Sequence, residues 1–110
     1  MTLYNQASFK NSRLASRKPT TQALTYHVNV PLAVNTLLRP ANPVRTYITI
    51  RNTSLLSTDI VYYDYFDNVN MLTEGFALKG GEAADLESPQ ALYAQATGNA
   101  SIIDIDEGEG

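Results

Sequence analysis

A chain of 110 residues is long enough for one domain with a single hydrophobic core, and no apolar run approaches the roughly 20 residues that span a bilayer. There is no cysteine, which excludes disulfides, thiolate metal sites and cysteine nucleophiles. The net charge of −3 conceals a division, because residues 1–51 hold seven of the eight bases and no acid, whereas residues 52–110 hold one base and all eleven acids. The two parts therefore carry +7 and −10, and such an asymmetry indicates an interaction tail or a polar assembly.

Residues 1–22 are polar and basic and show no stable hydrophobic period. One interpretation is a loose chain terminus, the default for such a segment. The other is an arm that orders on a partner, with apolar anchors and with cations that meet carboxylates or phosphates. The candidate contact residues of this arm are Tyr4, Phe9, Lys10, Arg13, Leu14, Arg17 and Lys18.

Residues 23–30 alternate between apolar and polar side chains, which predicts a strand. His27, the single histidine, falls on the polar side, and we expect a surface residue there rather than a metal ligand or a base. Pro31 interrupts the run, as at an edge strand or a bulge. Residues 32–38 then form a short extended piece, with Val34 and Leu37 as core candidates.

Residues 44–51 have the most regular alternation in the chain and follow a rigid corner made by Pro40 and Pro43. This pattern predicts a central strand. The side chains expected to face inward are Val44, Thr46, Ile48 and Ile50, and those expected to face outward are Arg45, Tyr47, Thr49 and Arg51.

Residues 59–66 predict a strand that is apolar on both sides and rich in tyrosine. A platform that stacks nucleic-acid bases is disfavoured, because Asp59, Asp64 and Asp67 would repel phosphate. A packed strand and a protein-contact surface are both compatible with the pattern. The candidates for contact with another subunit or with a host are Tyr62, Tyr63 and Tyr65.

The remaining segments predict a loop over residues 68–75 and strands over 76–78, 83–86, 91–96 and 101–105. Gly80-Gly81 and residues 97–100 are interpreted as hairpin turns. In total we expect an all-β fold, a small β-sandwich or jelly-roll-like barrel of seven to eight short strands with an extended N-terminal arm. The expected division is an arm over 1–22, a sandwich over 23–106 and a flexible acidic end over 107–110.

Little in the sequence supports catalysis. The pairs Asp64 with Asp67 and Asp104 with Asp106 resemble the two carboxylates of a glycosidase, but no nearby group divides the roles of acid and base between them. A calcium loop of the Asp-x-Asp-x-Asp-Gly type is missing. We therefore expect a protein that is not an enzyme and has no catalytic, metal-binding or cofactor-binding residues.

Two stretches of the sequence resemble those of a known class of proteins. Residues 37–54, L-L-R-P-A-N-P-V-R-T-Y-I-T-I-R-N-T-S, resemble a stretch found in small structural proteins of tailed bacteriophages. Residues 91–96 and 102–108, A-L-Y-A-Q-A and I-I-D-I-D-E-G, resemble the end of the same proteins, and together the two cover about a third of the chain. The resemblance implies a small β-sandwich of the virion, as in capsid decoration (cement or staple) proteins and head fibres.

The resemblance further implies a protein on the outer capsid surface that clamps neighbouring major capsid protein subunits and stabilises the head against the pressure of packaged DNA. It would be made in the bacterial host cytoplasm and assembled into the virion, where the basic arm would suit carboxylate-rich seams between capsid subunits. The alternatives are a head fibre or host-surface carbohydrate adhesion module, and a head–tail connector or tail component. We expect self-association, with a dimer favoured over a trimer, and no nucleic-acid or membrane partner.

Overall fold

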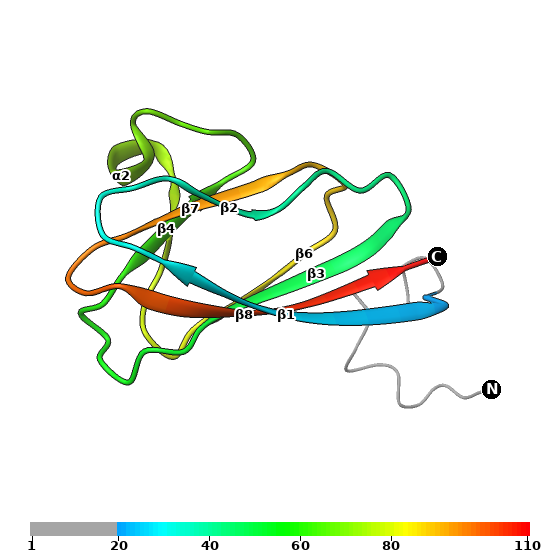
Figure 1. Ribbon diagram of the computed structural model, residues 1–110, viewed down its shortest axis with the longest axis horizontal. Coiled ribbons are helices and arrows are strands. Elements are labelled where there is room, and N and C mark those ends of the chain that lie inside the picture. Colours follow the sequence, from blue (N-terminus) through cyan, green and yellow to red (C-terminus); the bar gives the residue numbers. More distant parts are fainter. Residues whose placement is uncertain (1–19) are drawn as a thin grey trace, which may run out of the picture.

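The computed structural model describes residues 20–110, which form eight strands and one short helix (Figure 1). The elements are β1 Gln22–Val30, β2 Thr36–Arg39, β3 Arg45–Asn52, β4 Val61–Asp64, α2 Met71–Glu74, β5 Phe76–Leu78, β6 Ala83–Leu86, β7 Leu92–Ala96 and β8 Ser101–Glu109. The predicted all-β class is confirmed. No helix within the described range is long and apolar enough to cross a membrane.

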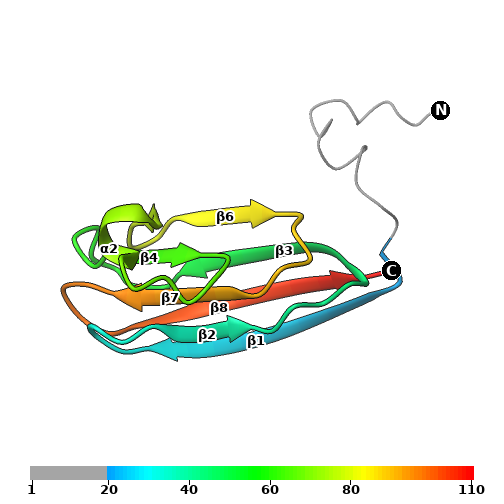
Figure 2. The same ribbon diagram turned by 90° about the horizontal axis from the view of Figure 1, so that it is seen from above.

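The strands form two four-stranded antiparallel sheets that pack as a sandwich (Figure 2). Sheet A has the order β1-β8-β3-β6, and sheet B has the order β2-β7-β4-β5. The pairs β1 with β8, β2 with β7, β3 with β6 and β4 with β5 are those of one long hairpin rolled into two layers. This connectivity is that of a jelly roll.

The core lies between the two sheets and consists of the inward side chains of each strand. Ile48 and Ile50 of β3 are buried as predicted, and β3 is an interior strand of sheet A. In β7 the predicted face of Leu92, Ala94 and Ala96 is buried as well. The buried cluster is Val30, Leu38, Ile48, Ile50, Val61, Tyr63, Leu78, Leu92, Ala94, Ala96, Ile103 and Ile105.

The two core candidates predicted in residues 32–38 are wrong, one of them before β2 and the other within it. Val34 and Leu37 are 54% and 45% exposed, whereas Leu38 is 3% exposed and belongs to the core. The pairing of β2 with β7 shifts register between Leu37 and Arg39, and this bulge displaces the side chains from strict alternation.

A second register shift lies between Arg45 and Tyr47 in the pairing of β3 with β8. It changes which side chains face inward at the start of β3, compared with the prediction. Val44 precedes β3 and is 52% exposed, although the alternation placed it inward. Arg45 was expected to face outward and is buried together with Thr46. A bulge lets two successive side chains point to the same side of a sheet.

Both predicted hairpin turns instead connect the two sheets. Residues 79–82 lead from β5 in sheet B to β6 in sheet A, and residues 97–100 lead from β7 in sheet B to β8 in sheet A. The turn chemistry itself is present, because Gly81 and Gly98 have positive φ values of 88° and 83°. A glycine permits the chain to reverse, but burial of the apolar face of each sheet against the other decides which strand becomes the partner.

Four predicted segments differ in extent or content from those of the structure. The tyrosine-rich strand is limited to β4, and the predicted loop over 68–75 contains α2. The predicted flexible end at 107–110 is wrong, since β8 continues to Glu109 and pairs with β1 and β3 along its length. Of the predicted arm, Gln22 belongs to β1, and residues 1–19 lie outside the described part of the chain.

Candidate functional site

Glu107 is the centre of a buried ionic cluster near the end of the sandwich where β8 finishes. Its side chain has no solvent exposure. Arg45 Nε donates a hydrogen bond to Glu107 Oε2 at 2.7 Å, and Arg39 Nε donates to Oε1 at 2.9 Å. Asn42 Nδ2 donates to Glu107 Oε2 at 3.0 Å and to Glu109 Oε2 at 2.6 Å. We call Arg39, Asn42, Arg45 and Glu107 the Glu107 cluster.

Arg45 connects this cluster to two loops. Its Nη1 donates to the backbone carbonyls of Ser88 and Gln90, at 3.0 and 2.6 Å, and its Nη2 donates to that of Pro40 at 2.9 Å. The Arg45 side chain is fully buried. One guanidinium therefore fixes the loop before β3 and the loop before β7 to the carboxylate on β8. This use of several donors in a fixed plane is characteristic of arginine.

The electrostatic environment keeps Glu107 ionised. Burial by itself would raise the pKa of Glu107, because it disfavours the charged carboxylate. The hydrogen bonds from Asn42, Arg45 and Arg39, together with the positive charge of Arg45, outweigh that effect and hold the pKa below its ordinary value. The cluster is therefore a charged, internally compensated unit of the fold.

Residues 37–54 and 91–108, the two stretches singled out in the sequence, meet in this cluster. Arg39, Asn42 and Arg45 belong to the first stretch, and Glu107 belongs to the second. The next residue, Gly108, is opposite Tyr47 in the β3–β8 register. The Tyr47 ring occupies the space that a Cβ atom at position 108 would need, so a side chain there would force this ring to move.

A second set of polar residues from the first stretch has a similar structural role. Asn52 is buried and its Nδ2 donates to the carbonyls of Asp59 and Leu78, at 2.8 and 3.0 Å. Ser54 Oγ donates to Asp59 Oδ2 at 2.7 Å, and Asn99 Nδ2 donates to Asp59 Oδ1 at 3.1 Å. These bonds hold together the loops at the opposite end of the sandwich, so the polar residues of both sets are accounted for by folding.

The predicted contact tyrosines have different environments. Tyr63 is 7% exposed and faces the core, whereas Tyr62 and Tyr65 are half-buried. The Phe76 ring lies 5.4 Å from that of Tyr63 and 6.3 Å from that of Tyr65, the latter in an edge-on arrangement. Burial and then the neighbouring Tyr65 raise the pKa of Tyr63, while burial and then Asp64 raise that of Tyr65. Tyr63 is therefore a core residue, and of the three candidates Tyr62 and Tyr65 have side chains that are partly accessible to a partner.

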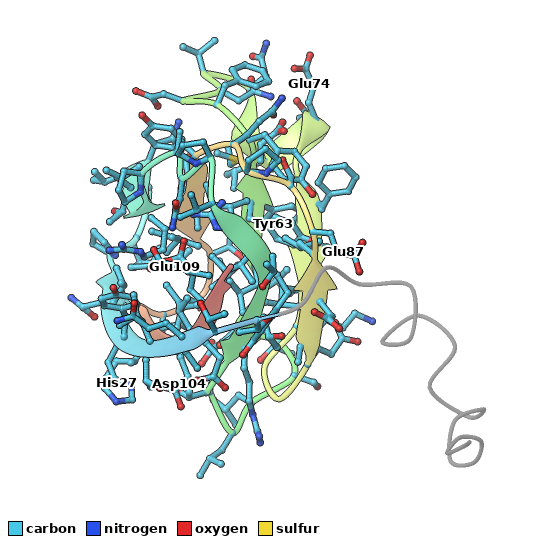
Figure 3. The ribbon with its side chains drawn as sticks, turned by 90° about the vertical axis from the view of Figure 1, so that its right-hand side faces the viewer. His27, Tyr63, Glu74, Glu87, Asp104 and Glu109 are labelled. Atoms are coloured by element: carbon cyan, nitrogen blue, oxygen red, sulfur yellow. The ribbon has the colours of Figure 1, made fainter. Side chains whose placement is uncertain are left out.

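The outer face of sheet A is polar. His27 is exposed, as expected, and its Nδ1 lies 2.5 Å from Asp104 Oδ1 on the neighbouring strand (Figure 3). Thr25 Oγ1 donates to Asp106 Oδ1 at 3.0 Å, one row further along the same two strands. These exposed cross-strand contacts each have a modest effect on stability.

The described residues offer no assembled chemical centre. Within 20–110 no group of three or more His, Asp or Glu side chains is placed to hold a metal ion. A surface hollow beside α2 is lined by Val69, Asn70, Met71, Leu72, Thr73 and Gln95, none of which ionises. The arm candidates Tyr4, Phe9, Lys10, Arg13, Leu14, Arg17 and Lys18 lie outside the described residues.

Sequence reasoning missed Glu107, although a signal for it was present. Ile103, Ile105 and Glu107 alternate on one side of β8, so the position of Glu107 is an inward one. Its acidic neighbours made the segment resemble a solvated tail.

No protein-family model matches the chain, and neither does any curated protein or solved structure.

Proposed function

We propose that this protein is a bacteriophage capsid decoration protein, which attaches to the outer capsid surface through residues 1–22 and clamps neighbouring major capsid protein subunits. The resemblance of residues 37–54 and 91–108 to phage structural proteins supports this proposal. Their meeting in one buried cluster is what a shared fold would require. The jelly roll is common in viral capsid proteins, although a fold by itself does not define a function.

The observation that carries the proposal is the separation of charge between the arm and the sandwich. The arm contains Lys10, Arg13, Arg17 and Lys18 and no acid, a charge of +4. Residues 20–110 contain four bases and eleven acids, a charge of −7. An anionic partner surface would therefore attract the arm and repel the sandwich.

The Glu107 cluster increases this separation. Of the four bases of the sandwich, Arg39 and Arg45 are bound to Glu107, and Arg51 and Lys79 are exposed. Asp59 and Glu107 are buried, and the other nine acids are at least partly exposed. Among residues 20–110 the cations outside the cluster are thus limited to Arg51 and Lys79, whereas the sequence of the arm holds four, which makes the arm the best-suited segment for contact with carboxylates.

Attachment through the arm also leaves most of the sandwich surface free. Strand β1 begins at the same end of the sandwich as the C-terminus, because Gln22 is paired with Glu109 (Figures 1 and 2). The loops 53–60 and 97–100 lie at the opposite end, beyond the far ends of β3 and β7. The start of β1 and these loops are therefore at opposite ends of the sandwich.

The proposal is tested by binding to purified empty capsids of the phage that encodes the protein. Deletion of residues 2–18 should abolish binding while the sandwich remains folded, because the Thr20 Oγ1 contact with Thr46 Oγ1 at 2.6 Å is retained. Replacement of the four arm bases by glutamine should weaken binding most at low salt, where screening is least. Phe9→Ala should weaken it at every salt concentration, because an apolar anchor is not screened.

A matched control removes cations from the sandwich instead of the arm. Arg51→Gln together with Lys79→Gln should leave capsid binding nearly unchanged, although the sandwich then carries two more units of net negative charge. Unchanged affinity of the protein that lacks residues 2–18 would show that the arm is not the attachment segment. Attachment would then have to be sought on the sandwich.

A host-surface adhesion module is the second candidate, because jelly rolls also form lectins and because Phe66 and Phe76 are 56% and 52% exposed. An exposed aromatic ring is a typical stacking surface for a sugar. The same deletion distinguishes the two functions. Binding to host cells that persists without residues 2–18 and is lost with Phe76→Ala would favour adhesion, whereas capsid binding that depends on the arm favours decoration.

A further inference from the structure

Strand β1 forms a long, free edge of sheet A. On one side all nine of its residues pair with β8, from Gln22 opposite Glu109 to Val30 opposite Ser101. On its other side no strand of residues 20–110 is hydrogen-bonded to it, because β1 ends the order β1-β8-β3-β6. A regular edge of this length presents a row of backbone donors and acceptors that another strand can pair with.

The other three edges carry features that discourage such pairing. β6 has four residues, contains Asp85 and is bordered by Glu82 and Glu87. β5 has three residues and is followed by Lys79. β2 is interrupted by a bulge and ends at Arg39, immediately before Pro40. Short length, charge, bulges and proline are the usual protections of an edge strand.

Within its nine residues strand β1 has none of these protections, and a proline, Pro31, follows only at its end. Its sequence, Gln-Ala-Leu-Thr-Tyr-His-Val-Asn-Val, has no acid, lysine, arginine or proline, and its pairing with β8 has no register shift. Its inward side chains Leu24, Tyr26 and Val28 are half-buried, whereas Ile103 and Ile105 on the neighbouring strand are fully buried. Among residues 20–110 the edge therefore combines unpaired backbone groups with partly covered apolar surface, of which the Tyr26 ring lies under the Arg39 guanidinium at 3.9 Å.

We propose that β1 pairs antiparallel with β1 of a second copy of this chain about a two-fold axis, so that two copies of sheet A become one eight-stranded sheet. A strand without acidic or basic charge can lie opposite itself without like-charge repulsion. An isologous contact of this kind closes on itself and leaves no further free β1 edge. The inference goes beyond capsid attachment and does not depend on it, because it rests on β1 alone.

The pairing has a geometric consequence for the arms. In an antiparallel pair the two Gln22 residues lie at opposite ends of the paired region. The eight steps from residue 22 to residue 30, at about 3.4 Å each, place them about 27 Å apart. A dimer would thus present two arms from separate points, an arrangement that suits simultaneous contact with two capsid subunits and increases avidity.

The test measures self-association of the full chain by sedimentation velocity over a range of protein concentrations. The wild type should dimerise reversibly. Ala23→Lys with Asn29→Lys, two exposed positions on β1, should weaken dimerisation about tenfold or more, since lysines are placed at the new strand pair. The matched control, Ala83→Lys with Ala77→Lys, adds the same charge at exposed positions on β6 and β5, away from β1, and should leave dimerisation unchanged.

A charge-reversed partner identifies the strand directly. Ala23→Asp with Asn29→Asp should also be monomeric, and mixing it with the lysine variant should restore a dimer. In wild-type protein, alternate β1 amides should gain protection from hydrogen exchange as concentration rises. A wild type that stays monomeric, equal dimerisation of wild type and lysine variant, or unchanged exchange of the β1 amides would each overturn the proposal. None of these measurements involves capsids, so a failure here is distinct from a failure of the arm to bind them.

Discussion

Removal of the Glu107 carboxylate should be among the most destabilising single changes in this protein. In Glu107→Ala the fully buried Arg45 guanidinium loses its counter-charge, and Asn42 and Arg39 lose an acceptor. A guanidinium group keeps its charge in proteins, so the uncompensated charge would stay buried. Arg45 also cannot turn to solvent without breaking its three bonds to backbone carbonyls.

The expected loss follows from the burial of the pair. Breaking a buried ion pair by removing one partner typically costs about 3–5 kcal/mol, and the total stability of a small domain is about 5–15 kcal/mol. We therefore expect Glu107→Ala to lower the free energy of unfolding by about 4 kcal/mol. Arg39 contributes less, because its side chain is 24% exposed and water can replace the lost acceptor.

The assay is urea unfolding followed by circular dichroism at pH 7. Asp106→Ala is the matched control, because Asp106 is the preceding residue on β8, is exposed and accepts one hydrogen bond from Thr25. It should cost at most about 1 kcal/mol. The double variant Arg45→Met with Glu107→Leu should be at least about 1 kcal/mol more stable than Glu107→Ala, because no buried charge is left alone. Equal losses in Glu107→Ala and Asp106→Ala would refute the reasoning.

Two further predictions concern pH and the register of β3. The pKa of Glu107 is lowered in the folded state, so its contribution to the free energy of unfolding is fully present above the unfolded-state pKa of about 4.3 and is lost as pH falls through the lower folded-state value. When urea unfolding is repeated at decreasing pH, the stability difference between wild type and Glu107→Gln should shrink below about pH 4.3. A difference that stays constant would contradict a lowered pKa. Ile48→Ala should lower the free energy of unfolding by about 2–5 kcal/mol, because Ile48 is fully buried. Thr49→Ala removes one hydrogen bond to Asp85 and should cost about 1 kcal/mol. Equal losses in the same denaturation assay would mean that both faces of β3 are equally covered.

Alternation was sufficient to predict the all-β class and the inward faces of the regular strands. It predicts Ile48 and Ile50 correctly because β3 is regular after its first residues. It fails at Leu37 and Val44, both of which lie next to register shifts. A bulge depends on what the partner strand and the loops require, and such long-range requirements leave no mark on a local two-residue period.

The ionic cluster could not be predicted from local pattern either, because its members are far apart in the chain. Arg45 and Glu107 are separated by 62 residues and meet through the pairing of β3 with β8. The wrong hairpin turns have the same origin. Residues 97–100 have suitable turn chemistry, but β8 gains two partners in sheet A, so the chain crosses between the sheets. The partner of a strand is a property of the whole fold.

Ionic strength should separate the two surfaces proposed for this protein. The arm carries four uncompensated positive charges, so its attachment to an anionic surface should weaken as salt rises from about 0.05 M to about 0.5 M. The β1 edge has no acid, lysine or arginine, so its pairing depends on backbone hydrogen bonds and apolar contact, which salt at these concentrations hardly screens. A dimer that persists at high salt would hold two arms together, so both arms must be released before the protein leaves the capsid. The wild type should therefore lose capsid binding at higher salt than the β1 lysine variant does, although both carry the same arm.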